Sequence, residues 1–298
     1  MKNTKIITTL VVVIALLSLA ATLTGILSGI GTDSSHYVFE SIHGQHVTIF
    51  GKGVYRHMSA DVAIQGIAQD YVTLFFGIPA LLFSLIRARK GTLQSKLLLA
   101  GILTYFFLTY LFYMNMAMYN ALFLVYIALT GTTFFALTLT MLSIETEMLP
   151  NYFTTSTPVK FIGGFLIFTA SSIALLWMSI VVPPLLDRTI IPQSVEHYTT
   201  LTVQGFDLAL FHPLTFIAGL LLIRKNKMGY LLAPVMLIFL SLLMTALIAK
   251  IIAMAIAGVN VIPAIFIIPV IAVIAITCAI ILMRNIKTPN YNETHTAN

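Results

Sequence analysis

The stretch IQGIAQDYVTLFFGIPALLFSLIRARKG, residues 64–91, places one aspartate, Asp70, in front of an apolar run that ends in a basic cluster. A second stretch, VQGFDLALFHPLTFIAGLLLIRKNKMG, residues 203–229, has the same order with Asp207. In both stretches the first arginine follows the aspartate by 17 positions, and a proline interrupts the apolar run. Because about 20 apolar residues span a bilayer, both stretches predict spanning helices.

The composition of the whole chain supports a membrane protein. Of its 298 residues, 59% are hydrophobic and only 9% are charged, whereas a soluble domain carries about 25% charged residues. The net charge of +6 is spread in short clusters between apolar runs, so we expect no nucleic-acid partner. The single cysteine, Cys278, excludes an intrachain disulfide and four-thiolate metal sites. We therefore predict an all-α, polytopic membrane helix bundle.

Apolar runs predict eight transmembrane helices, with the lipid bilayer as the main partner. The first continues past the signal-like sequence SLA, so we expect it to be retained, although the sequence does not settle whether it is cleaved. The approximate limits are 6–30, 71–88, 97–116, 118–143, 161–184, 206–223, 230–256 and 261–283.

The distribution of charge predicts the topology. With the N-terminus in the cytoplasm, 12 of the 16 lysines and arginines fall on the cytoplasmic side, and seven of the ten acids fall outside. This asymmetry follows the positive-inside rule, so we expect cytoplasmic N- and C-termini. The cytoplasmic set is Lys2, Lys5, Arg87, Arg89, Lys90, Lys96, Lys160, Arg224, Lys225, Lys227, Arg284 and Lys287.

The two quoted stretches also predict an internal repeat. Each is followed by a glycine and then by a similar segment, LLLA at 97–100 or YLLA at 230–233. Four crossings per unit keep two copies in the same orientation, which makes a parallel 4+4 repeat. The alternative is that membrane hairpins resemble one another. The expected organisation is a first unit over 1–143 with an outer loop at 31–69, a connector at 144–160, a second unit over 161–284, and a disordered tail at 285–298.

Several segments resemble an uncharacterised family of bacterial multi-pass inner-membrane proteins with about eight helices. They are FGKGVYRHMSADVAIQGIAQDYVTLFFGIPALL at 50–82, the tyrosine-rich segment 119–126, and the second aspartate stretch. The resemblance covers most of the chain. It implies a location in the bacterial cytoplasmic membrane and carries no activity with it.

Polar residues gather at the predicted outer rim. One stripe, spaced by four residues, runs along a helix that leads into the second span. Asp70 and Asp207 stand at the membrane boundary, where they are either part of a ligand vestibule or simple N-caps of their helices. The vestibule candidates are His57, Asp61, Gln65, Gln69, Asp70, Asn115, Tyr119, Asn120, His197, Asp207, His212 and Lys250.

Two of these residues carry a specific expectation. His212 precedes Pro213, where a kink is expected, and it lies five residues after Asp207. Five residues of α-helix turn about 140° past a full circle, so the two side chains need not touch. Lys250 either snorkels to water or pairs with Asp70 or Asp207 at a central cavity.

Tyrosines and threonines on the third and fourth spans predict a polar path, with helix packing as the alternative, which is the better one for the threonines. They are Tyr105, Thr109, Tyr113, Tyr126, Thr130 and Thr133. His43, His46 and His57 form a weak metal pattern. The segment HVTIFGKGVYR, residues 46–56, predicts a β-hairpin around its glycines.

These patterns favour a small-solute permease or carrier with a vestibule open to the outer face. The absence of a predicted mid-membrane charge weighs against it. One alternative is a membrane-embedded enzyme that acts on a lipid-linked substrate at the outer leaflet, by acid–base or metal chemistry. Another is a sensor or assembly partner that uses the outer loop. Substrate, cofactor and oligomeric state are not predicted.

Overall fold

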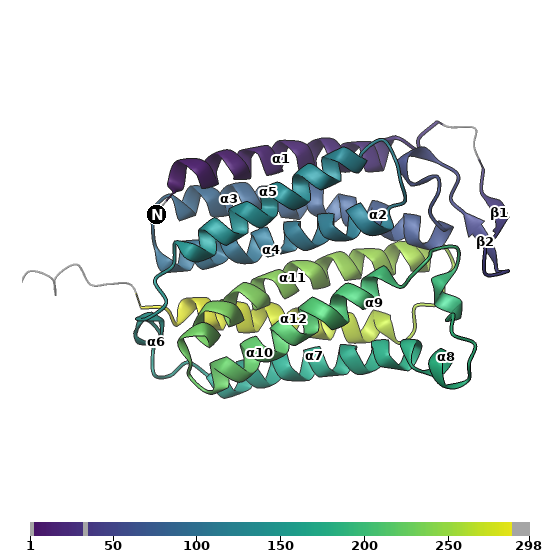
Figure 1. Ribbon diagram of the computed structural model, residues 1–298. Helices are drawn as coiled ribbons and strands as arrows, with labels where there is room; N and C mark the ends of the chain where they lie inside the picture. The colour runs from purple at the N-terminus through teal and green to yellow at the C-terminus, as the bar shows by residue number, and fades with distance from the viewer. Residues whose placement is uncertain (1–2, 32–34, 288–298) are drawn as a thin grey trace, which may run out of the picture.

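The computed structural model describes residues 3–31 and 35–287. Within these residues, eight helices are long and apolar enough to cross a membrane, which agrees with the eight predicted spans and makes this a multi-pass membrane protein. Both ends of the described chain lie at the same end of the bundle, and a small hairpin lies at the other (Figure 1). The spans are Thr4–Leu27, Ala60–Ala88, Leu93–Met116, Phe123–Leu142, Val159–Leu186, Thr202–Ile223, Lys227–Ile256 and Ala264–Arg284.

The helices follow one another in two groups. The first contains α1 (Thr4–Leu27), α2 (Ala60–Val72), α3 (Ile78–Ala88), α4 (Leu93–Met116) and α5 (Phe123–Leu142). The second contains α7 (Val159–Val181), α9 (Thr202–Phe206), α10 (His212–Ile223), α11 (Lys227–Ile256) and α12 (Ala264–Arg284). Two short helices, α6 (Leu149–Tyr152) and α8 (Pro183–Leu186), lie in connections.

The second and sixth spans are each interrupted by a π-helical segment. Segment η2 (Thr73–Gly77) joins α2 to α3, and η4 (Asp207–Phe211) joins α9 to α10. Pro79 and Pro213 occupy the second position of the helix that follows. Because proline has no N–H to donate and its ring crowds the preceding turn, it disfavours a regular α-helical ladder there. The residues before the prolines instead bond five residues back, Ile78 to Thr73 and His212 to Asp207.

The limits of the second span differ most from the prediction. Its helix begins at Ala60 rather than at 71, so the segment 60–69 is helical and not part of the outer loop. The sequence SADVAIQGIAQ had predicted a helix leading into this span, and the structure joins the two without a break. Asp70 therefore lies inside a long helix.

The two groups form an upper and a lower layer in Figure 1. Within the upper layer α1 packs on α2, α3 and α5, and α4 packs on α3 and α5. Within the lower layer α7 and α11 pack on α10, and α12 packs on α11. Contacts between the layers join α11 to α4 and α2, and α4 to α9. The backbones approach closely at Gly101, where an added Cβ would lie 2.5 Å from Cβ of Ile238.

At the end of the bundle that holds the chain ends, the connector between the layers pairs with the segment after α12. Thr154 N donates to Asn285 O over 2.9 Å, and Lys287 N donates to Tyr152 O over 2.7 Å. The prediction of a disordered tail from 285 is thus wrong for residues 285–287. The remainder, 288–298, lies outside the described residues.

The opposite end carries a cap built from two loops (35–59 and 187–201), which we call the outer cap after the side on which the sequence predicts it. Strands β1 (Tyr37–Glu40) and β2 (His46–Ile49) pair antiparallel, with Tyr37 opposite Ile49. The predicted hairpin is therefore wrong in its partner strand: β2 matches HVTI, but the glycines after it lead into the 3₁₀ turn η1 (Gly53–Tyr55).

Hydrogen bonds join the two loops of the outer cap. Nε2 of His43 lies 3.1 Å from the Tyr198 carbonyl oxygen, and Nε2 of His197 lies 2.8 Å from that of His57. Ser59 N donates to the Tyr198 hydroxyl over 3.3 Å. Burial raises the pKa of Tyr198 to about 12, although the bonds with Ser59 oppose this shift. The cap therefore ties the two layers together outside the spans.

Candidate functional site

Asp70 is the most deeply buried carboxylate of the described chain, with 3% of its surface exposed. It lies near the end of α2 and accepts hydrogen bonds from two tyrosine hydroxyl groups. Tyr55 donates to Oδ2 over 2.5 Å, and the Tyr113 hydroxyl lies 3.0 Å from Oδ1 and 2.8 Å from the Gly66 carbonyl oxygen. Hydrogen bonds from hydroxyl groups offset the cost of removing a carboxylate from water.

A glycine makes this burial possible. An added Cβ at Gly25, near the end of α1, would lie 1.9 Å from Oδ2 of Asp70 and 2.9 Å from the Tyr55 hydroxyl. Only a residue without a side chain lets α1 come so close. Gly25 thus closes the side of the carboxylate that faces α1.

A second set of polar side chains lies next to Asp70 on the face that α2 presents to α4. Nε2 of Gln69 donates to the Tyr105 hydroxyl over 2.7 Å, and that hydroxyl lies 2.9 Å from Oγ1 of Thr73. Oγ1 of Thr109 lies 3.4 Å from the same Gln69 nitrogen. These residues are all buried, so the α2–α4 contact is polar at this level and held by specific bonds.

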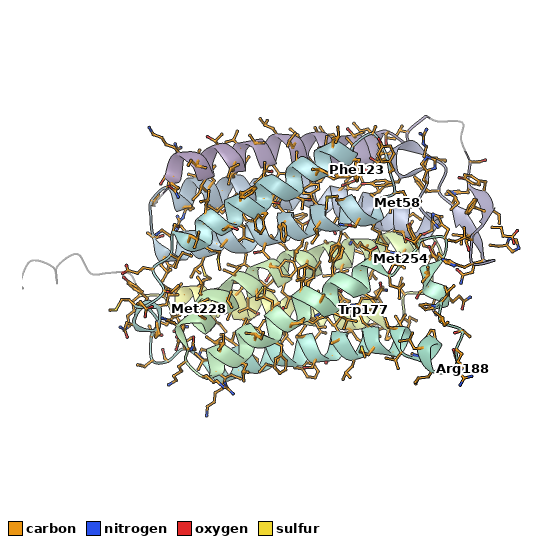
Figure 2. All side chains as sticks on the ribbon, viewed as in Figure 1. Met58, Phe123, Trp177, Arg188, Met228 and Met254 are labelled. Carbon is orange, nitrogen blue, oxygen red and sulfur yellow. The ribbon has the colours of Figure 1, made fainter. Side chains whose placement is uncertain are left out.

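Asp207 lies in the lower layer, at the start of η4. The indole N–H of Trp177, the chain's single tryptophan (Figure 2), donates to Oδ2 of Asp207 over 2.8 Å from α7. Nε2 of His212 lies 3.8 Å from the same oxygen and has no hydrogen-bond partner among the described residues. From α-helical spacing, Asp207 and His212 were expected on different helix faces, but the structure places their side chains 3.8 Å apart. A π-helical hydrogen bond joins residue i to i+5, which places the two side chains one turn apart.

Lys250 lies on α11, the helix between the two spans that carry the aspartates. Its helix packs against α2 on one side and against α10 on the other. In the described part of the chain no carboxylate oxygen lies within 4.0 Å of its ammonium nitrogen. Asp70, Lys250 and Asp207 therefore form a spaced charge cluster at the interface of the two layers, which we call the interface cluster.

The N-cap interpretation of the aspartates does not hold. Asp70 lies ten residues into its helix, and Asp207 follows the α9 helix that continues into η4. Their positions before the apolar runs had predicted both aspartates at the membrane boundary, where water reaches a carboxylate. Tyr55 of the outer cap, Tyr113 of α4 and Gly25 of α1 surround the Asp70 carboxylate instead, so little of it is exposed.

The other predicted vestibule residues divide into two kinds. Gln69 lies next to Asp70 in the chain and is buried, whereas Asn115 and Tyr119 are exposed. Asn120 caps the turn before α5 by accepting from Leu122 N over 2.8 Å.

The predicted polar stripe of four residues changes character along its length. His57 precedes the helix, Asp61 is exposed and Gln69 is buried. Gln65 donates from Nε2 to the Asp61 carbonyl oxygen over 3.2 Å. His197 joins the outer cap, as described above. The stripe thus runs from the surface into the bundle and does not form a single open vestibule.

The predicted polar path is present only in part. Tyr105, Thr109 and Tyr113 take part in the networks around Gln69 and Asp70, and Tyr126 stacks on Tyr113 with ring centroids 5.4 Å apart. The hydroxyls of Thr130 and Thr133 bond to carbonyl oxygens of their own helix, at Tyr126 and Leu129. The hydroxyl groups of these two threonines are therefore used within α5.

His43, His46 and His57, which form the weak metal pattern, have different surroundings in the structure. Among the described residues, no group of three or more His, Cys, Asp or Glu side chains is arranged to hold a metal ion. His43 bonds across the cap, and Nε2 of His57 accepts from Arg56 over 3.1 Å. His46 lies on β2 with its side chain exposed.

Sequence reasoning missed three residues that shape the site. The hairpin prediction places Tyr55 in a strand. The predicted spans include Trp177 and Gly25 but give them no role. Tyr55 and Trp177 each carry a hydrogen-bond donor on a large apolar side chain, which is the type that pairs when buried. Their residue types were a usable signal, but their partners lie 15 and 30 positions away.

No protein-family model, no curated protein and no solved structure matches this chain. The membrane class and the multi-pass architecture therefore rest on its eight apolar helices.

Proposed function

We propose that the protein is a small-solute carrier whose binding centre is the interface cluster. The observation that carries the proposal is that α11, which carries Lys250, packs on both π-interrupted spans, and that each of these spans carries an aspartate. Broken helices and charged side chains inside a bundle are features of substrate and ion sites in transporters.

The charges of the cluster are unequal. With Asp70 and Asp207 ionised, two carboxylates face one ammonium group, and a buried negative charge without a partner is costly. A proton or a cationic solute would offset that charge. We therefore propose that the transported solute is cationic, or that its movement is linked to a proton taken up at the cluster.

The proposal includes the parallel 4+4 repeat. In a parallel repeat about an axis along the membrane normal, equivalent helices next to the axis pack on each other. The segments LLLAG at 97–101 and YLLAP at 230–234 are the matching starts of α4 and α11, and these two helices pack together. Gly101 approaches Ile238, and the carbonyl oxygen of Val235 lies 3.0 Å from its added Cβ. These contacts support a pivot between the halves at this level.

The contacts on either side of the pivot also favour a repeat. Helix α2 packs on α11, and α9, its proposed equivalent, packs on α4. Phe112 of α4 has ring contacts with Phe206 and Phe211, at centroid distances of 5.7 and 5.9 Å. The π-interrupted spans would then be equivalent elements that flank the pivot, and π-bulges of this kind are frequent at functional sites.

Access from the outer side would pass the outer cap. Tyr55 belongs to the cap and reaches down to Asp70, while the neighbouring Val54 N donates to Oγ of Ser28 over 3.0 Å at the end of α1. Withdrawal of this segment would uncover the carboxylate. We propose that the structure corresponds to a state in which the cap closes the centre from the outside.

The positive-inside rule orients the carrier with both termini in the cytoplasm. The resemblance described above favours a bacterial cytoplasmic membrane. Under this orientation the cap and the interface cluster face the outer side.

A flux assay in proteoliposomes tests the proposal. The purified protein, reconstituted with a pH-sensitive dye inside, is exposed to a panel of organic cations, amino acids and sugars. We expect at least one solute to drive proton movement or a charge displacement that Asp70→Asn and Asp207→Asn abolish. The matched control is Asp187→Asn, because this outer carboxylate is exposed and bonds to Thr189 outside the cluster. No response across the panel, or a response that both cluster variants retain, would reject the carrier.

One observation favours a second candidate, an enzyme acting at the outer leaflet. The Asp207–His212 pair, with Nε2 of His212 free of a hydrogen-bond partner among the described residues, is suited to acid–base chemistry. Turnover of a lipid-linked substrate that is lost in His212→Gln but retained in Asp70→Asn would favour this candidate over the carrier.

A further inference from the structure

The outer cap contains a polar cavity of about 430 Å³ that is separate from the interface cluster. Its walls come from the turn and second strand of the hairpin, from the first residues of α2, and from the loop that precedes α9. Among the lining residues are Gln45, Ser59, Asp61, Gln193 and Glu196. The cavity falls within the size range of small-molecule sites, roughly 300–1,000 Å³.

Three polar atoms in the cavity wall are buried and have no partner among the described residues. They are Oε1 of Gln45, Oγ of Ser59 and Oε2 of Glu196. Buried polar atoms are paired in the large majority of cases, so three in one wall call for a missing partner. The cavity is therefore built around something that can donate hydrogen bonds.

Ser59 is the most telling of the three. It stands at the N-cap of α2, where a serine hydroxyl normally accepts from the first turn, yet it makes no such cap bond. Only 2% of its surface is exposed, and it lines the cavity. Its hydroxyl is thus free for a ligand rather than used by the helix.

The cavity wall presents mainly hydrogen-bond acceptors and negative charge. Nε2 of Gln45 donates to the Gln193 carbonyl oxygen over 3.2 Å, which leaves Oε1 as the free end of the amide. Glu196 and Asp61 add carboxylates, and the lining contains neither lysine nor arginine. Although the N-terminus of α2 favours anions, these two carboxylates already supply negative charge there. His46 is the one basic side chain in the lining.

We propose that this cavity binds a primary ammonium group. Such a group is positively charged and carries three N–H donors, which match the free oxygens of Gln45, Ser59 and Glu196. The ammonium group belongs either to a free solute or to the headgroup of an amine-bearing lipid. Because the ligand would bridge the hairpin, α2 and the loop before α9, it would fasten the outer cap in its closed arrangement.

Thermal unfolding of the full chain in amine-free detergent tests this site. Ethanolamine and putrescine are the probes, and choline is the matched cation without N–H donors. We expect ethanolamine and putrescine to raise the unfolding temperature saturably and choline to leave it unchanged. An equal response to choline, or no saturable response to either amine, would overturn the proposal and leave the cavity to water.

Variants locate the effect. Glu196→Gln and Ser59→Ala are expected to weaken ethanolamine binding by about tenfold or more. The first removes the negative charge that attracts the ammonium group, and the second removes a hydrogen bond to a charged group. Glu40→Gln, an exposed acid on β1 outside the cavity, is the control and should bind as the parent does. Glu196→Gly serves as a second variant, because Glu196 has a φ of 54° that glycine accepts without strain. Unchanged binding in folded Glu196→Gly protein would also overturn the site.

The source of the ammonium group is distinguished in nanodiscs. If the response to ethanolamine is present in phosphatidylcholine discs and absent in phosphatidylethanolamine discs, the lipid headgroup already occupies the cavity. If the response is equal in both, the ligand is a free solute. The measurement is binding, so its result is independent of solute flux through the interface cluster.

Discussion

Replacement of Gly25 by alanine tests how Asp70 is held. The new methyl group would stand 1.9 Å from Oδ2 of Asp70 and 2.9 Å from the Tyr55 hydroxyl. Neither neighbour can retreat freely, because Asp70 is fixed by two hydroxyl donors and Tyr55 is 1% exposed. We therefore expect the Tyr55–Asp70 bond to break.

The free-energy cost follows from the contacts. Overpacking costs about 1–3 kcal/mol and the lost bond to a charged group about 1.5–3 kcal/mol, while the helix gains up to about 1 kcal/mol from alanine. The net loss is therefore about 1.5–6 kcal/mol. At roughly 2 °C per kcal/mol or more, the unfolding temperature should fall by at least about 3 °C. A thiol-reactive dye reports unfolding directly, because Cys278 is the chain's single cysteine and is buried.

Two variants make the Gly25 prediction specific. Gly131→Ala on α5 is the matched control, since an added Cβ there meets no atom within 4 Å. In a Tyr55→Phe background the hydroxyl is already absent, so Gly25→Ala should cost less than it does in the parent. The reasoning is refuted if Gly25→Ala unfolds at the temperature of Gly131→Ala, or if the Tyr55→Phe background leaves its cost unchanged.

Three further substitutions have defined outcomes. Gly101→Ala should destabilise the protein by about 1–3 kcal/mol in the same dye assay, because its Cβ would press on Ile238 between the layers; parent-like stability would argue against close contact at this point. Trp177→Phe should reduce flux while the protein stays folded. Asp207→Ala, which removes both oxygens that can accept from the indole N–H, should shift the emission of Trp177; an unchanged spectrum would contradict their hydrogen bond. Tyr198 has a pKa raised to about 12 against an ordinary value near 10, so its neutral form stabilises the cap below pH 10 and that contribution is lost as the pH rises toward 12. Stability measured across this window should fall less steeply in Tyr198→Phe, and identical slopes would contradict the burial of the phenol.

The membrane class, the eight spans and most span limits were predictable because they depend on local composition. An apolar run of about 20 residues has few alternatives to a spanning helix. The start of the second span was placed too late because residues 60–69 contain glycine, glutamine and aspartate. Those residues pack against other protein segments. The hydropathy of a sequence window gives no information about such packing.

The candidate site was predictable in its residue types but not in its geometry. Asp70, Asp207 and Lys250 stood out as charges beside apolar runs, and the sequence raised their pairing as one option. The contact between Asp207 and His212 could not be foreseen from α-helical spacing, since it depends on the π-helical turn before Pro213. The burial of Asp70 depends on Tyr55 and Gly25, which approach it from other parts of the chain.

The most direct test of the central claim is a double-mutant cycle between Lys250 and Asp70, measured as free energies of unfolding. The account predicts that Lys250→Met leaves both carboxylates without their counter-charge, and that Asp70→Asn in the same protein restores part of the loss. The coupling should exceed about 1 kcal/mol but stay below about 4, the energy of two unit charges 4 Å apart at an effective dielectric constant of 20. A cycle that is additive within about 0.5 kcal/mol would contradict a shared interface cluster.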